Sequence, residues 1–270
     1  MQAAGLVDTP KMSQAQFTRV CEMLYRLSGI VMRPGKEDLA QSRLARRLRA
    51  TNSHSYDEYL GIVERDKQEL ARMVDVLTTN KTNFMREPAH FDLIADDSAH
   101  NWASLDTVRI WSAACSTGEE PYTIAMTLLD RQPAIAKRTR ILATDLASHV
   151  LEKARKAEYR PEAMTGVPKA WLSKYFEPIG NGSYRVNATV RRMVSFARLN
   201  LLDRWPMGGP FQAIFCRNVM IYFDKETQLM LAARFRELLA NDGYLLIGHA
   251  ESFGTSGHEL RYVKPAVYAR

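Results

Sequence analysis

The stretch that decides the fold of this chain is Val108-Arg-Ile-Trp-Ser-Ala-Ala-Cys-Ser-Thr-Gly-Glu-Glu-Pro-Tyr122. It begins as a short apolar run of β-formers, continues as a loop of small residues, and passes into a helical period from about Glu120 to Asp130. Further strand-like runs lie at 140–145, 194–200, 211–218 and 244–248, and the tail 261–270 is a candidate final strand. Asp242-Gly243 is expected to be a tight turn into the run at 244–248. Strands that alternate with helices of about 10–15 residues predict an α/β fold with a parallel sheet.

The chain before this stretch is predicted to be wholly helical. Apolar residues recur at helical spacing near 12–27, 36–50, 55–63 and 67–78, and no strand pattern occurs before about residue 105. One later segment breaks the alternation of strands and helices, because Gly180-Asn-Gly182 is a hairpin-type turn between short polar flanks. We expect a disordered extension at 1–11 and a helical domain at 12–78. A linker that contributes to the active site follows at 79–104. The sheet domain spans 105–270 and carries a β insertion at about 173–195.

The composition excludes several classes of protein. With 46% hydrophobic and 25% charged residues, the 270-residue chain is neither disordered nor fibrous. No apolar run approaches the roughly 18–20 residues that cross a bilayer, and Met1–Lys11 lacks the pattern of a signal peptide. The cysteines Cys21, Cys115 and Cys216 are few and widely spaced, which fits reduced cytosolic thiols and predicts neither a disulfide framework nor a zinc site.

The formal net charge of +7 is ambiguous by itself, because nucleic acid, an anionic membrane, an acidic protein or a solvated surface would all accommodate it. Residues 1–90 hold 14 Lys/Arg against 11 Asp/Glu, and the remainder holds 23 against 19, so the excess is spread over both parts. It is densest between Arg33 and Arg49. There Arg43, Arg46 and Arg47 share one face of a predicted helix, which is either solvated or a docking face for an acidic partner.

The ends of the first two strands carry candidate ligand residues. Gly118 lets the backbone approach a ligand closely, but the loop is no G-x-G-x-x-G dinucleotide fingerprint. Glu119 and Glu120 would repel a pyrophosphate and suit an ammonium group or sugar hydroxyls, unless they only favour the helix N-terminus. Asp145 stands where doubly wound folds place an acid on ribose hydroxyls. Together these features favour a nucleoside ligand without a diphosphate, such as S-adenosylmethionine (SAM).

Two more segments have a composition that suits a site. Cys216-Arg-Asn-Val-Met-Ile-Tyr-Phe-Asp224 places Asn218 and Tyr222 among apolar residues, without the Asn/Asp-Pro-Pro-Tyr run of several SAM enzymes that methylate amide or base nitrogen. The alternative is an ordinary strand-to-helix turn with a packed tyrosine. The segment Leu77–Phe91 is too polar for a core and too rich in donors for a plain linker, so we expect it to reach over the ligand.

Five motifs, in this order along the chain, resemble the CheR family of chemotaxis receptor methyltransferases. They are Asn80-x-Thr82-x-x-x-Arg86, Trp111 to Tyr122, Ala143-Thr-Asp145, Asn200-Leu-Leu202 and Ile214 to Asp224. The resemblance covers the chain from about Met12 to Arg270. It implies a SAM-dependent protein-glutamate O-methyltransferase, releasing S-adenosylhomocysteine, with a helical N-terminal domain and a Rossmann-like SAM domain that carries a small antiparallel β insertion.

The resemblance also implies roles for single residues. The family's ligand-contacting positions fall on Asn80, Thr82, Arg86, Glu120, Asp145, Asn200, Leu201, Arg217 and Asn218. Its active-site arginine and tyrosine fall on Arg86 and Tyr222. Glu120 and Asp145 would hold the ammonium or ribose groups of SAM, and which acid holds which stays open. No metal is expected.

The implied partner is the acidic, helical methylation region of a chemoreceptor, which the arginine face at Arg43, Arg46 and Arg47 would dock. The turn region Glu177–Ser183 looks shorter than in family members that bind a receptor's C-terminal pentapeptide, so we expect independence from that tether. We expect a bacterial cytoplasmic monomer that is recruited to receptor arrays and neither enters the membrane nor binds nucleic acid.

A non-catalytic SAM sensor and a nucleic-acid methyltransferase remain the alternatives. The presence of both Arg86 and Tyr222 disfavours the first of them.

Overall fold

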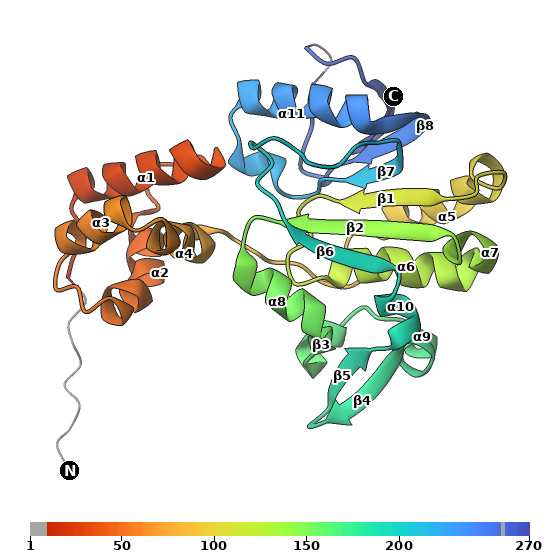
Figure 1. Ribbon diagram of the computed structural model, residues 1–270, viewed down its shortest axis with the longest axis horizontal. Helices are drawn as coiled ribbons and strands as arrows, with labels where there is room; N and C mark the ends of the chain where they lie inside the picture. The colour runs from red at the N-terminus through yellow and green to blue at the C-terminus, as the bar shows by residue number, and fades with distance from the viewer. Residues whose placement is uncertain (1–9, 255–256) are drawn as a thin grey trace. The chain divides into compact units, whose positions relative to one another are not determined.

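The computed structural model describes residues 10–254 and 257–270, so the expected N-terminal extension lies outside the described residues except for Pro10 and Lys11. The chain divides into two compact units, one up to Thr79 and one from Asn80 onward (Figure 1). Among the described residues, no helix combines the length and the apolar character that a membrane span requires. Each unit is described by itself.

The first unit is all-helical, as predicted. It comprises α1 (Gln14–Ser28), α2 (Glu37–Ala50), α3 (Tyr56–Arg65) and α4 (Lys67–Leu77). Ser13 and Gln16 form a capping box at the start of α1, and Gly29 ends that helix with a left-handed φ of 68°. The apolar stripes of the helices, including Val20 and Leu44, are fully buried and form the core of the unit.

The second unit is built on a Rossmann-like sheet. Its parallel strands are β1 (Val108–Ser112), β2 (Thr139–Asp145), β6 (Val194–Arg198), β7 (Phe211–Phe215) and β8 (Leu239–Leu246). They lie in the order β6-β2-β1-β7-β8, which is third-second-first-fourth-fifth along the chain (Figure 1). This is the strand order of the Rossmann fold. The predicted fold class is therefore confirmed, and its switch point lies between β1 and β7.

Two features of the sheet differ from the sequence prediction. The tail forms two strands, β9 (Arg261–Lys264) and β10 (Val267–Ala269), and β10 runs antiparallel between β8 and β9, so the sheet is mixed. The turn expected at 242–243 is an irregularity inside β8, where the register against β7 shifts. A Cβ on Gly243 would lie 2.8 Å from the carbonyl oxygen of Phe211, so glycine permits the close passage of the two backbones there.

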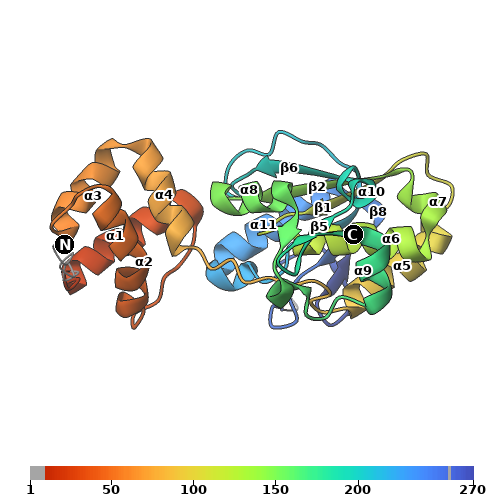
Figure 2. The ribbon, with the colours of Figure 1, turned by 90° about the horizontal axis from the view of Figure 1, so that it is seen from below.

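Helices cover both faces of the sheet. On one face α5 (Ala89–Asn101) packs Phe91 on Phe215, with ring centres 5.9 Å apart, and α6 (Glu119–Arg131) adds Tyr122 to the same core. On the other face Trp111 packs against Phe235 of α11 (Lys225–Leu238) at 5.3 Å. Figure 2 shows α5, α6 and the short α7 (Pro133–Ala136) close together, and α8 (Ser148–Lys156) follows β2.

The predicted β insertion is confirmed as a small antiparallel sheet. β4 (Phe176–Gly180) and β5 (Ser183–Val186) meet at Asn181 and Gly182, which both have positive φ, as a tight hairpin turn requires (Figure 1). The sheet has a third strand, β3 (Glu158–Tyr159), outside the range predicted for the insertion. The remaining short helices of the region are η1 (Pro161–Met164), α9 (Lys169–Tyr175) and α10 (Ala188–Arg191).

Candidate functional site

The candidate site lies at the carboxyl ends of the parallel strands, where open α/β sheets bind their ligands. Glu120 belongs to the first turn of α6 after β1, and Asp145 is the last residue of β2. Asn200 and Leu201 follow β6 in a loop that begins beside β2, because the amide of Leu199 donates to the carbonyl oxygen of Asp145 at 3.0 Å. Arg217 and Asn218 follow β7 by two and three residues.

The loop after β1 is held in an unusual backbone conformation. Ser116 and Gly118 have φ values of 48° and 95°. A side chain at Gly118 would bring its Cβ to 3.0 Å from both the Cβ of Ala154 and the hydroxyl of Tyr159, so only glycine fits. Asp145 accepts a hydrogen bond from the amide of Ser116 at 2.8 Å, and Ser116 Oγ donates to the carbonyl oxygen of Asn80 at 2.9 Å. These bonds tie the predicted residues Asn80 and Asp145 to one loop.

A buried arginine joins the ends of β1 and β7. The guanidinium of Arg217, 1% exposed, lies 3.2 Å from Glu120 Oε2 and 3.1 Å from Glu87 Oε2. Arg217 Nη2 also donates to the carbonyl oxygen of Arg86, and Ser112 Oγ donates to Glu120 Oε1 at 2.7 Å. When both are ionised, two carboxylates around one guanidinium carry a net negative charge, which suits a cationic ligand group.

The two carboxylates differ in their ionisation. Burial raises the pKa of Glu120, and the opposing effects of Arg217 and the Ser112 hydrogen bond are weaker. Burial also acts upward on Glu87, but Arg217, His249 and Asn218 outweigh it and hold the pKa of that carboxyl below its usual value. Glu87 is therefore the constant anionic partner of Arg217, whereas the charged form of Glu120 would gain from a cationic ligand group.

The turn after β7 is organised by Glu251, which the sequence prediction missed. Its carboxylate accepts hydrogen bonds from the amides of Asn218 at 2.8 Å, Gly248 at 2.6 Å and Ile221 at 3.1 Å. Asn218 has a left-handed φ of 57°, and a Cβ on Gly248 would lie only 2.3 Å from Asn218 Nδ2. The one available signal was position, because Gly248-His-Ala-Glu251 follows the carboxyl end of the fifth strand.

The segment around Arg86 also has a constrained backbone. Met85 and Glu87, on either side of Arg86, have φ values of 58° and 55°. Arg86 Nη1 donates to the carbonyl oxygen of Lys81 at 2.9 Å, while its own carbonyl oxygen accepts from Arg217. Described contacts thus link Arg86 to Arg217 through the main chain.

The other predicted residues are placed by their own loops. Thr82 lies partly buried in the segment before Arg86, and Tyr222 ends a 3₁₀ turn, η2 (Met220–Tyr222). Asn200 Oδ1 accepts from the amide of Leu202 at 3.1 Å. The carbonyl oxygen of Leu201 accepts from Trp205 Nε1 and Arg234 Nη1.

Two of the three predicted docking arginines are engaged within the helical unit. Arg43 Nη1 donates to the carbonyl oxygens of Leu77 and Thr78 at 2.6 and 3.2 Å, at the end of α4. Arg47 Nε donates at 2.8 Å to Glu69, which is 1% exposed. Arg46 is exposed. The helical period of the sequence predicts that the three arginines share one face of α2. It carries no information on α4, whose C-terminal end binds Arg43 and whose Glu69 binds Arg47.

The cysteines are free thiols, as expected from their spacing. Cys115 and Cys216 are buried beside the loops that follow β1 and β7, and burial raises the pKa of both thiols well above its usual range. The raised pKa values favour the protonated form of both thiols at neutral pH.

Comparison with known proteins identifies the class of the enzyme. Residues 80–268 match the family model described as "CheR methyltransferase, SAM binding domain", and residues 15–78 match "CheR methyltransferase, all-alpha domain". The Rossmann-like sheet and its strand-end carboxylates therefore belong to a SAM-dependent methyltransferase. More narrowly, the chain belongs to the CheR family of chemotaxis protein methyltransferases, which confirms the resemblance.

Relatives are similar along almost the whole chain. The chemotaxis protein methyltransferase of Escherichia coli is 41% identical over 265 residues, which are 96% of this chain and 91% of that protein. The Salmonella typhimurium protein of the same name is 40% identical over the same shares. "Chemotaxis protein methyltransferase 2" of Pseudomonas aeruginosa is 42% identical over 95% of this chain and 93% of its own length.

Proposed function

We propose that this enzyme methylates the γ-carboxyl groups of specific glutamates on the cytoplasmic part of chemoreceptors and thereby tunes sensory adaptation. The observation that carries the proposal is the 41% identity to a chemotaxis protein methyltransferase across 96% of the chain. The network of Glu87, Arg217 and Glu120 at the switch point supports it, because it offers negative charge to a cationic methyl donor. In this proposal the enzyme acts in the cytoplasm as a monomer recruited to receptor arrays.

The residues of the site fit SAM chemically. Glu120 is a partly neutralised carboxylate for an ammonium or ribose group, and Asp145 stands at the end of β2. The buried Oδ1 of Asn218 has no hydrogen-bond partner among the described residues, which fits an acceptor completed by a ligand donor. We propose that SAM is held by the predicted set Asn80, Thr82, Arg86, Glu120, Asp145, Asn200, Leu201, Arg217 and Asn218. When bound, SAM supplies an electrophilic methyl group.

The proposed chemistry needs alignment rather than a base. A glutamate with a pKa of about 4.3 is already ionised at neutral pH. A carboxylate lone pair forms the new C–O bond, and the electrons of the C–S bond pass to sulfur, so no proton moves. Orientation alone can supply up to ~7–11 kcal/mol. In this proposal Arg86 binds the substrate carboxylate and Tyr222 orients it, and the Arg86 contact positions rather than clamps, since tight ground-state binding would not raise the rate.

Labelled SAM tests this proposal directly. Incubated with receptor-bearing membranes of the same cell, the enzyme should transfer label to the receptors, and mild base should release it as methanol, because carboxyl esters are base-labile. Base-stable label on the receptors would identify another acceptor group. Label on nucleic acid, or SAM binding with no transfer, would support the alternatives of a nucleic-acid methyltransferase or a SAM sensor.

Receptor docking through α2 is tested at Arg46, the exposed member of the predicted arginine face. Arg46→Glu removes one attraction to an acidic receptor helix and adds a repulsion, so we expect receptor methylation to fall about two- to tenfold. The loss should shrink at high salt, since exposed charges are screened. Arg26→Glu on α1 makes the same charge change at another exposed position and is the matched control. Equal methylation by both variants would contradict docking at Arg46. Arg47 is unsuitable, because it pairs with buried Glu69.

Independence from a receptor pentapeptide is proposed from the short hairpin turn. β4 and β5 join directly through Asn181 and Gly182, so the turn has no extra residues. Calorimetry of the enzyme with a receptor C-terminal peptide should show no saturable heat at micromolar concentrations. Methylation of a receptor truncated by its last five residues should equal that of the intact receptor. Tight peptide binding, or loss of methylation on truncation, would overturn this proposal.

A further inference from the structure

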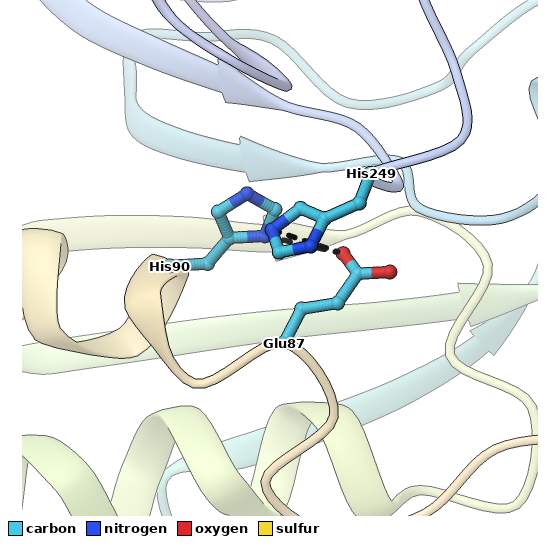
Figure 3. Close-up of side chains that lie close together, drawn as sticks. All are labelled: Glu87, His90 and His249. Carbon is cyan, nitrogen blue, oxygen red and sulfur yellow. Dashed lines mark ion pairs between the residues drawn. The ribbon is translucent and has the colours of Figure 1, made fainter.

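Three side chains from two distant parts of the chain converge beside Arg217. Glu87 precedes α5, His90 lies in the first turn of α5, and His249 follows β8 (Figure 3). His90 Nδ1 lies 3.6 Å from Glu87 Oε2, and His249 Nε2 lies 4.0 Å from the same oxygen. One ligand atom from each residue lies within 4.8 Å of the others.

The buried environment of His90 distinguishes this group of three residues from a chance cluster. Its side chain is 1% exposed, and neither ring nitrogen has a hydrogen-bond partner among the described residues. A buried polar group without a partner costs about 1–3 kcal/mol, so it needs an explanation. The ring faces Glu87 and His249 (Figure 3). A ligand with an affinity for imidazole nitrogen would satisfy Nδ1, the ring nitrogen that lies beside Glu87.

We propose that Glu87, His90 and His249 bind a divalent transition-metal ion, with Zn²⁺ as the physiological candidate. Two imidazole nitrogens and one carboxylate oxygen are a familiar Zn²⁺ donor set, which leaves a fourth position open. Metal–ligand distances of about 2.0–2.2 Å place tetrahedral donors about 3.3 Å apart. The spacings of 3.6 and 4.0 Å to Glu87 are close to that value, and all three ligand atoms lie within 4.8 Å of one another, so side-chain rotation would have to draw the donors together.

The surroundings of the three residues determine how the metal would be bound. Burial and the nearby charge of Arg217 lower the pKa of His90 and favour its neutral imidazole, the form that coordinates a metal, while the same charge disfavours any cation nearby. The side chain of His249 is 53% exposed, which provides a path from solvent. Arg217 competes with the metal, because its guanidinium lies 3.1 Å from Glu87 Oε2. The affinity should therefore be moderate.

The same competition couples the metal to the SAM site. Drawing Glu87 toward a metal leaves Arg217 to pair with Glu120 alone, which makes Glu120 less available to a ligand. A divalent ion also adds positive charge beside a cationic methyl donor. Metal and SAM should therefore oppose each other, and linkage requires each to weaken the other by the same factor. The site would then make receptor methylation sensitive to free Zn²⁺.

Metal binding is measured on the full chain without any methylation assay. After chelator treatment, Zn²⁺ titration against a chromophoric competitor should give one site per chain. Co²⁺ bound at the same site should show the visible d–d absorption of tetrahedral coordination and no thiolate-to-metal charge-transfer band. His249→Ala should weaken Zn²⁺ binding at least tenfold, since it removes one of three ligands. His100→Ala, an exposed histidine at the end of α5, should leave it unchanged. Equal Zn²⁺ affinity for wild type and His249→Ala, or thiolate bands from a cysteine site, would overturn the proposal.

Coupling is measured as SAM affinity by calorimetry without Zn²⁺ and at a Zn²⁺ concentration that saturates wild type but leaves His249→Ala largely metal-free. Wild type should lose affinity several-fold, whereas His249→Ala should show the same SAM affinity in both conditions. Unchanged SAM affinity in zinc-loaded wild type would overturn the coupling. Because these readouts are binding constants, they stand or fall independently of which substrate the enzyme methylates.

Discussion

Arg86→Ala is expected to lower receptor methylation about 10²-fold or more while changing SAM affinity little. A misplacement of about 1 Å in an aligned reaction can cost about 10²-fold, and loss of the guanidinium removes the proposed contact that aligns the substrate carboxylate. Arg86 also belongs to the proposed SAM-binding set, but the other eight residues of that set remain in the variant, so SAM affinity should change only a few-fold. The group of Arg86 that Arg217 contacts is its carbonyl oxygen, and alanine keeps that oxygen.

Kinetics and calorimetry together check this prediction. Turnover at saturating receptor should fall, and the calorimetric Kd for SAM should stay within a few-fold of wild type. Arg86→Lys should recover part of the turnover, because lysine retains the charge but not the planar fork. Lys81→Ala is the matched control, since it removes an exposed cation from the same segment and spares the main-chain oxygen that receives Arg86 Nη1. Wild-type turnover in Arg86→Ala would remove Arg86 from the active site.

Local pattern predicted most of the fold because the deciding signals are local. The apolar run at β1, the small-residue loop and the start of α6 follow one another within 108–122. The capping box of Ser13 and the hairpin turn at Asn181 likewise depend on neighbours in sequence. The two-residue strand β3 is too short to carry a periodic signal. The Asp242-Gly243 pair has the sequence of a turn, and only its approach to Phe211 makes it a strand irregularity.

The candidate site divides along the same line. The sequence predicts Glu120, Asp145 and Asn218 as site residues, because the strand pattern shows that they lie at the carboxyl ends of parallel strands. The strand pattern does not predict which side chains form ion pairs or hydrogen bonds with one another. Glu87 and Arg217 are far apart in sequence, and so are Arg47 and Glu69, so composition indicated the charges without indicating which ones pair. His90 and His249 meet only because α5 and the end of β8 lie together.

The largest expected effect on the architecture of the site comes from Glu251. Its carboxylate receives the amides of Asn218, Gly248 and Ile221, so it binds the turn after β7 to the end of β8. It does so although burial raises the pKa of this carboxyl, because the three N–H donors favour its charged form. Glu251→Ala would leave three donors without their acceptor, at about 1–3 kcal/mol each. We expect the free energy of unfolding to fall by about 3 kcal/mol or more.

Glu251→Gln separates positioning from folding. Glutamine keeps the shape and one oxygen, but its amide group must face at least one backbone N–H, at a cost of about 1–3 kcal/mol. We expect a folded protein in which the turn that carries Asn218 and precedes Tyr222 has shifted, so SAM affinity and turnover both fall about tenfold or more. Urea unfolding and SAM calorimetry measure the two effects. Glu259→Gln, an exposed acid paired with Arg236, should change neither quantity measurably. If Glu251→Gln binds SAM as tightly as wild type, the geometry at Asn218 does not depend on this carboxylate, because a glutamine cannot accept all three amides at once.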